Sequence, residues 1–293
     1  MNWKWEIAKA DHIGGRDEQQ DKVAVFSAPN GETHLLVVAD GMGGHKGGYF
    51  ASQLVIKSAQ LLWDKYQQGR VVTTPQKFLQ RICELAHQKI NQFGKKYQLS
   101  PGSTCILLYI KGKQAWWAHI GDSRLYYFRH KKLRHRTRDH SVVQLLADLG
   151  HITEEEMATH PDQGCLLRGL GGDEPAKPEF GQAQLRAGDS FVLCSDGFWE
   201  HVSAPKMRDR LLQKHFPVKK RVKQLLKDAL DAGGAEGDNI AVAVAQVQSK
   251  TLFNKIVSMV LGLIVIALLG GNVSMVPLQM AYAGTGTGTE LGR

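Results

Sequence analysis

The residues of this sequence that could do chemistry are aspartates that stand next to strongly apolar runs. Asp40 ends the run LLVVAD, Asp122 follows AWWAHIG, and Asp196 ends FVLCSD. Asp238 stands in the triplet GDN, directly before the run IAVAVAQV. A glycine is next to each of these aspartates, and glycine permits the sharp turn that a strand end needs. The pattern therefore predicts several carboxylates at the ends of buried strands.

Carboxylates that gather at one edge of a sheet repel each other and need a cation. Mg²⁺ and Mn²⁺ take oxygen ligands from aspartate, backbone carbonyls and water. The chain contains no HxxxH or HExxH spacing, which argues against a histidine-rich zinc site. A single Asp-Gly pair is usually only a turn. The prediction of a hydrolytic site that binds divalent metal ions therefore rests on four such aspartates, each at a strand end, and not on any single Asp-Gly pair.

The strands and helices that must position these aspartates are grouped along the chain, with several strands in succession and then several helices. Helical spacing or helix-start signals mark residues 51–68, 75–97, a short stretch from Thr153, and 205–232. Alternating or apolar strand-like segments cover residues 3–10, 22–28, 33–40, 104–110, 114–120, 124–129, 189–196 and 240–247. Strands and helices in separate runs favour an α+β fold with a mostly antiparallel sheet over a parallel βαβ fold.

The composition is that of a globular protein. The chain has 293 residues, of which 43% are hydrophobic and 22% charged, with a formal net charge of +9. These values exclude a wholly disordered chain and a multi-span membrane protein, and the net charge by itself selects no partner. Four widely spaced cysteines predict reduced, mostly buried thiols. Because no linker is apparent before about Gln248, residues 1–248 are predicted to form one domain.

The C-terminal part of the sequence differs from the rest. Residues 249–255 form a short basic linker, and residues 256–276 carry no charge. As a helix, these 21 residues would span about 31 Å, near the thickness of a bilayer core. The basic residues lie on the N-terminal side, so the positive-inside rule predicts a single-pass protein of the cytoplasmic (inner) membrane whose large N-terminal part lies in the cytoplasm. Residues 277–293 are predicted to be a flexible Gly/Thr-rich tail.

The order of the motifs resembles that of a known family. GGRDEQQD, VVADGMGGHKGG, GSTC, HIGDSR, DHSVVQLLADLGHIT, LCSDGFWE and GDN follow one another in the pattern of the metal-dependent protein Ser/Thr phosphatases, the PPM or type 2C family, in their bacterial form. The resemblance covers about residues 5–247. It implies a four-layer α-β-β-α sandwich of two antiparallel sheets flanked by helices, with the metal site at one end. The segment 139–172 resembles the family's flap beside the active site.

The resemblance also implies a set of ligands for two Mn²⁺ or Mg²⁺ ions. Asp40 matches the aspartate that bridges the two ions, and Gly41 matches the glycine whose carbonyl joins it. Asp196 and Asp238 match the other carboxylate ligands, and Asp21 matches an acidic position that binds through water.

Three further positions carry implied roles. Arg16 matches the arginine that binds the substrate phosphate, and Asp122 matches a residue that holds a third, weaker metal ion. Asn239 follows the last ligand and is expected to orient it. The implied reaction is hydrolysis of phosphoserine and phosphothreonine by a hydroxide that bridges the two ions, without a covalent intermediate.

The expected partners are Ser/Thr-phosphorylated proteins, a cognate bacterial Ser/Thr kinase, and the membrane through the C-terminal helix. The catalytic domain is expected to be monomeric, and no nucleic acid is expected as a partner. Two alternatives stay open: a regulatory module that binds phosphoproteins with weak turnover, and a metal-dependent hydrolase of a non-protein phosphate ester.

Overall fold

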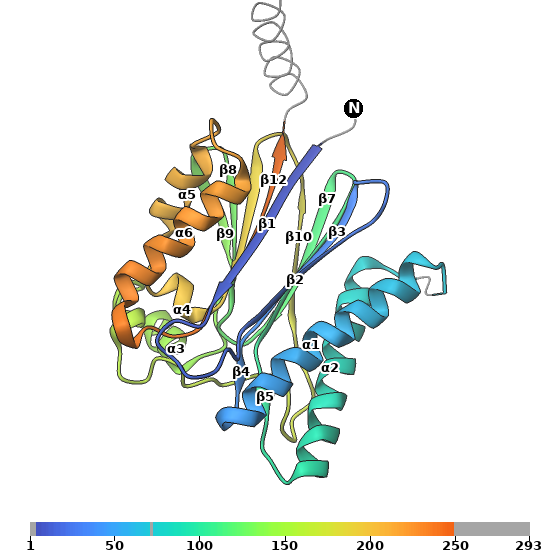
Figure 1. Ribbon diagram of the computed structural model, residues 1–293, viewed down its shortest axis with the longest axis vertical. Helices are drawn as coiled ribbons and strands as arrows, with labels where there is room; N and C mark the ends of the chain where they lie inside the picture. Colours follow the sequence, from blue (N-terminus) through green and yellow to red (C-terminus); the bar gives the residue numbers. More distant parts are fainter. Residues whose placement is uncertain (1–3, 71–72, 249–293) are drawn as a thin grey trace, which may run out of the picture. The chain divides into compact units, whose positions relative to one another are not determined.

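The strand-forming runs build two five-stranded sheets in the computed structural model, which describes residues 4–70 and 73–248 (Figure 1). One sheet has the order β1-β12-β11-β8-β9 and the other β10-β7-β6-β3-β2, and every neighbouring pair is antiparallel. The bounds of these strands are β1 (Lys4–His12), β2 (Lys22–Ser27), β3 (Thr33–Ala39), β6 (Cys105–Lys111), β7 (Gln114–Ile120), β8 (Arg124–Arg129), β9 (Lys132–Arg136), β10 (Glu179–Gln184), β11 (Asp189–Cys194) and β12 (Ile240–Gln248).

Pairs of long helices cover the outer faces of both sheets. α1 (Gly44–Gln67) and α2 (Pro75–Tyr97) pack on the sheet that contains β3, through apolar side chains such as Val55 and Ile82. α5 (Ala204–Leu212) and α6 (Val218–Gly233) pack on the sheet that contains β12, through side chains such as Leu225. A third apolar layer, which includes Leu36 and Phe191, lies between the sheets. The expected α+β architecture with four layers is confirmed.

Several shorter elements lie at the end of the sandwich where β3 and β11 finish. They are the two-stranded ladder of β4 (Gly41–Met42) and β5 (Gly102–Ser103), the helices α3 (Val142–Asp148) and α4 (Asp196–Trp199), and the 3₁₀ turns η1 (Glu156–Thr159) and η2 (Gly234–Glu236).

Two helix predictions needed correction. The helix predicted at 51–68 begins earlier, at Gly44, because Gly43 adopts a φ of 110° that only glycine tolerates well and thereby starts the helix directly after β4. The basic helix predicted over 205–232 is two helices. Pro217 has no amide hydrogen and fixes its own φ, so it begins α6 instead of continuing α5.

Within the described residues, no helix combines the length and apolarity that a membrane span requires. The predicted linker 249–255, membrane helix 256–276 and tail 277–293 all lie outside the residues that the structure describes.

Candidate active site

The strand ends that carry the predicted aspartates meet at one end of the sandwich. Asp40 follows β3, and Asp21 precedes β2 directly beside it, since Lys22 pairs with Ala39 in the ladder. From the other sheet, Asp196 follows β11 and Asp238 lies just before β12, two neighbouring antiparallel strands. Asp122 lies in the turn from β7 to β8, which passes from one sheet to the other. Both sheets therefore contribute carboxylates to one site.

These residues line a cleft of about 620 Å³. Its walls include all of the predicted site residues except Asp21, which is buried, and they also include part of the segment that resembles the flap. A neighbouring cleft of about 900 Å³ shares Met42 and Leu166 with it but contains none of the clustered aspartates. The chemistry of the site therefore belongs to the smaller cleft. Its lining residues are Gly15, Arg16, Asp17, Glu18, Gln20, Asp40, Gly41, Met42, Gly44, Asp122, Gln163, Gly164, Leu166, Asp196, Asp238 and Asn239.

Burial and mutual repulsion raise the pKa values of four carboxylates of this cluster. Desolvation raises the pKa of Asp21 to about 8, and the charge of Asp196 adds to the shift. The pKa values of Asp40 and Asp122 are also raised well above the ordinary value, first by desolvation and then by the charge of Asp196. Asp196 itself has a raised pKa because of desolvation and the nearby charge of Asp238. A cluster of this kind holds its negative charge only when a cation compensates it.

The donor atoms fit divalent metal ions that prefer oxygen. Asp21 Oδ2 and Asp122 Oδ1 are buried and have no hydrogen-bond partner among the residues that the structure describes. An orphaned buried carboxylate oxygen is costly unless a cation or an ordered water binds it. Because the converging side chains offer oxygen donors and no cysteine or histidine is among the described residues that line the cleft, Mg²⁺ or Mn²⁺ suits this site better than Zn²⁺.

Backbone hydrogen bonds hold Asp40 in place at the end of β3. Its amide donates to Thr104 Oγ1 at 3.0 Å, and its carbonyl accepts from the Thr104 amide at 2.8 Å and from Ser103 Oγ at 2.8 Å. Gly41 follows, and a Cβ atom there would lie 2.0 Å from the carbonyl oxygen of Gly48. The chain therefore needs glycine after Asp40, because α1 passes too close for any side chain.

Arg16 and Asp238 lie together at the rim of the cleft. Arg16 Nη2 donates to Asp238 Oδ2 at 2.9 Å, and the arginine side chain is 58% exposed. Asn239 orients Asp238 through its backbone, since its amide donates to Asp238 Oδ1 at 2.7 Å. The side chain of Asn239 makes separate contacts, in which Nδ2 donates to the carbonyl of Ile13 and Oδ1 accepts from the amide of Gln20. Asn239 thus fixes the loop that carries Arg16 against the start of β12.

Two residues of the site are absent from the sequence-based prediction. Glu200 follows Asp196 by four positions on the turn of α4, and desolvation and the charge of Asp196 raise its pKa to about 8. Gln163 comes from the flap-like segment, contacts Glu200 Oε1, and places its Nε2 3.4 Å from Asp196 Oδ2. The i, i+4 spacing in SDGFWE could have indicated Glu200. No local pattern points to Gln163, because it comes from a loop.

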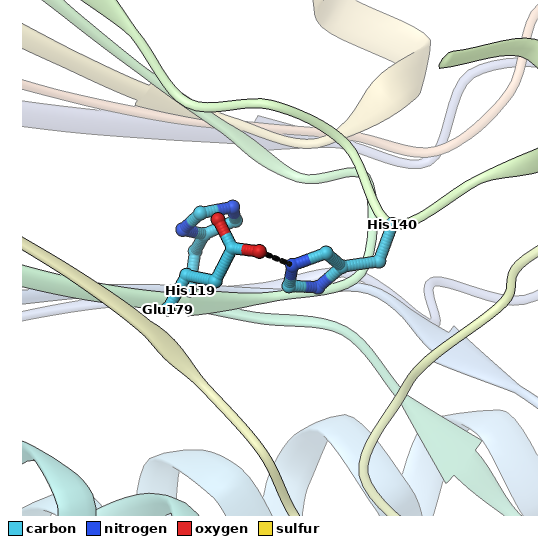
Figure 2. A group of neighbouring side chains, drawn as sticks. All are labelled: His119, His140 and Glu179. Atoms are coloured by element: carbon cyan, nitrogen blue, oxygen red, sulfur yellow. Dashed lines mark ion pairs between the residues drawn. The ribbon is translucent and has the colours of Figure 1, made fainter. Parts of the chain in front are cut away.

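His119, His140 and Glu179 form a cluster of side chains (Figure 2), and His140 contacts the turn that carries Asp122. His119, His140 and Glu179 each bring one potential ligand atom within 4.8 Å of the others. The two rings are stacked with an interplanar angle of 11°, so their in-plane lone pairs do not converge on one point. The Gly121 amide donates to His140 Nδ1 at 3.2 Å, which leaves the proton of the neutral ring on Nε2, 3.1 Å from Glu179 Oε1. This geometry is not that of a preformed metal site, and His119 Nε2 instead lies 2.8 Å from the carbonyl oxygen of Arg138.

His140 has a clear structural effect. His140 also donates its backbone amide to the carbonyl of Gly121 at 3.0 Å, so it holds this glycine from both sides. Because Gly121 directly precedes Asp122, His140 fixes the position of one carboxylate of the cluster.

Comparisons with known proteins agree with this geometry. The sequence pattern of the family Protein phosphatase 2C matches residues 10–245. Protein phosphatase PhpP of Streptococcus pneumoniae is 33% identical over 247 residues, which are 84% of this chain and 98% of that protein. The crystal structure of the Mycobacterium tuberculosis serine/threonine phosphatase PstP/Ppp has a TM-score of 0.71 at 32% identity and covers 84% of this chain and 99% of that one. The catalytic domain of PstP in complex with two manganese ions has a TM-score of 0.70 at 30% identity, with coverage of 84% and 100%.

Proposed function

The chain belongs to the protein phosphatase 2C family and is a Ser/Thr protein phosphatase, and on this basis we propose which of its residues bind the metal ions and which bind the substrate. Asp40, the carbonyl of Gly41, Asp196 and Asp238 would hold two Mn²⁺ or Mg²⁺ ions. Asp21 would bind one of them through water, and Asp122 would hold a third, weaker ion. The observation that carries this assignment is the buried, mutually repelling cluster with unpartnered oxygens on Asp21 and Asp122.

Divalent ions held by these residues would lower the pKa of a bound water at neutral pH and would neutralise charge on the phosphate. The protein's own residues position these parts. The strand ends fix the carboxylates before substrate arrives, which avoids reorganisation during the reaction. Arg16 lies at the exposed rim, where its planar guanidinium can leave Asp238 and bind two phosphate oxygens at once.

We propose that the substrates are proteins phosphorylated by a bacterial Ser/Thr kinase. The fragment 1–250, which forms one compact unit, is expected to release phosphate from a phosphothreonine peptide only when Mn²⁺ or Mg²⁺ is present. EDTA should abolish the release, and a nucleotide and DNA should be poor substrates. Absence of release from a folded fragment that still binds Mn²⁺ would favour a phosphoprotein-binding module. Faster release from the nucleotide would favour a hydrolase of non-protein esters.

Arg16→Ala is expected to lower kcat/KM for the phosphopeptide by about 10²-fold, since one preorganised charged donor to the transition state is lost. Arg16→Lys should recover part of this loss, because a lysine keeps the charge but not the bidentate geometry. The thermal stabilisation of both variants by Mn²⁺ should match that of the wild type, because Arg16 is not a metal ligand. An unchanged kcat/KM in Arg16→Ala would refute its role at the phosphate.

We propose that residues 256–276 span the inner membrane and leave the catalytic domain in the cytoplasm. The support comes from the sequence: 21 uncharged residues follow Lys250 and Lys255 on the cytoplasmic side. The full chain should stay in the membrane pellet after alkaline carbonate extraction, and the fragment 1–250 should be released. Ile264→Lys combined with Leu268→Lys should release the full chain, since each lysine costs about 3 kcal/mol at the centre of a span. Extraction of the wild-type full chain by carbonate would contradict the span.

A further inference from the structure

The catalytic cleft lies at the end of the sandwich where β3 and β11 finish. The opposite end of the two sheets is built from a different set of segments (Figure 1). The strand register defines this distal end: β12 finishes there at Gln248, which pairs with Lys4 at the start of β1. The turns β2–β3, β6–β7, β8–β9 and β10–β11 lie at the same end. Each of these turns joins a strand whose opposite end lies at the cleft, so the turn itself lies at the distal end.

These distal segments carry many exposed cations. The cations come from the start of β1, from three of the turns, and from the chain between α5 and the first turn of α6. We call them the distal basic face: Lys4, Lys111, Lys113, Lys131, Lys132, Arg186, Lys214, Lys219 and Lys220, all of them exposed.

Backbone contacts join the segments into one surface around the end of β12. The amide of Gly188 donates to the carbonyl of Val247 at 3.2 Å, and the amide of Leu185 donates to the carbonyl of Lys113 at 2.9 Å. Lys131 and Lys214 line the same small cavity of about 170 Å³, together with Gly188 and Gln246 of β12. The cations therefore surround the point at which the chain leaves the domain.

Negative charge is scarce on this face. Glu32 is the acidic residue of the β2–β3 turn and is only half-exposed, and Asp189 at the start of β11 is buried and paired with Arg129. Asp209 of α5 is exposed and close enough to interact with the charge of Lys131, but its ion pair is with Arg208. Among the described residues, no carboxylate forms an ion pair with Lys131, Lys132 or Lys214. Lys131, Lys132 and Lys214 thus add net positive charge to this face.

We propose that the distal basic face binds the anionic phospholipid headgroups of a membrane. The inference rests on the proposed span at 256–276. Only seven residues, 249–255, separate the end of β12 from that segment, and a chain of this length reaches at most about 25 Å. A domain tethered so closely holds this end near the anionic leaflet, where each lysine or arginine strengthens binding about fivefold.

The orientation has a consequence for catalysis. β12 has nine residues and runs from the cleft to the distal basic face, so the cleft would stand roughly 30 Å from the lipid surface. With the distal end on the membrane, the cleft opens away from it. Phosphorylated side chains of cytoplasmic proteins would then reach the site without approaching the bilayer.

Sedimentation of the fragment 1–250 with vesicles tests the proposal without using the span or the catalytic activity. The probes are vesicles of phosphatidylcholine alone and vesicles that also contain phosphatidylglycerol. The distal variant combines Lys113→Glu, Lys131→Glu and Lys132→Glu. The matched control combines Lys57→Glu, Lys95→Glu and Lys96→Glu, three exposed lysines of α1 and α2 with the same change in net charge.

The wild-type fragment should bind the anionic vesicles, not the neutral ones, and should dissociate as salt is added. The distal variant should lose affinity on the order of 100-fold, and the control should stay near the wild type. Equal losses in both variants, wild-type binding by the distal variant, or tighter binding to RNA than to anionic vesicles would each overturn the proposal. Phosphopeptide hydrolysis by the distal variant should equal that of the wild type, so failure here is distinguishable from failure of the phosphatase function or of the span.

Discussion

Asp196→Asn is expected to lower kcat for phosphopeptide hydrolysis by at least about 10³-fold and to leave the fold intact. Loss of a single preorganised polar contact to the reacting groups already costs about 10²- to 10³-fold in other enzymes, and this substitution removes a full charge from the centre of the cluster. The charge of Asp196 acts on Asp21, Asp40 and Asp122, so its removal alters the whole site. Phosphate release from a phosphothreonine peptide at saturating Mn²⁺ measures the effect.

The stability of the same variant separates a metal ligand from a structural residue. In EDTA, Asp196→Asn should melt at a higher temperature than the wild type, because one of several repelling buried carboxylates is gone. Addition of Mn²⁺ should stabilise the wild type and should stabilise the variant much less. Asp173→Asn, which changes an exposed carboxylate outside the cluster, is the matched control and should behave as the wild type. Normal turnover by Asp196→Asn would refute the assignment of the site.

The second large effect is a loss of stability with rising pH after the metal has been removed. The pKa of Asp21 is about 8 in the folded chain and near its ordinary value of 3.8 in the unfolded chain. Between these values the folded state holds a proton that the unfolded state has released. Stability is therefore greatest at the acidic side of this window and falls as the pH rises toward 8. Asp40, Asp122, Asp196 and Glu200 have raised pKa values and act in the same direction.

Thermal unfolding of the fragment 1–250 in EDTA should show this dependence as a fall in Tm on the order of 5–10 °C between about pH 5 and pH 8. Mn²⁺ should abolish most of the fall, because the ions replace the protons as partners of the carboxylates. Asp21→Asn should flatten the curve in EDTA, since the amide does not titrate. A Tm in EDTA that rises across this range would show that the cluster is not desolvated as the structure indicates.

The aspartates at the strand ends show which site residues a local sequence pattern can predict. A buried strand that ends in Asp-Gly can be recognised from the sequence alone, because a buried strand and a sharp turn each have a characteristic local residue pattern. Asp40 and Asp196 were therefore identified from pattern alone, and the order of the motifs supplied Arg16, Asp21 and Asn239. Two helix predictions had wrong boundaries. The left-handed Gly43 and the break at Pro217 moved them by several residues.

Contacts between distant segments could not be read from the chain. Gln163 reaches Asp196 from a loop, and His140 holds Gly121 from nineteen positions away. Asn239 orients Asp238 as expected, but its side chain binds the loop of Arg16, more than 200 positions earlier. None of these pairs leaves a periodic signal, because each depends on how two loops meet after the sheets have formed.

The sequence by itself determined the types of the elements, the family and the carboxylates at the strand ends, because these depend on residues that are neighbours along the chain. The tertiary structure decided which strand ends meet. β1 pairs with β12 from the other end of the domain, and the two sheets pack face to face, so five aspartates converge at one end and the lysines gather at the other. That separation follows from strand order and register, which long-range pairing and the burial of both sheet faces determine together.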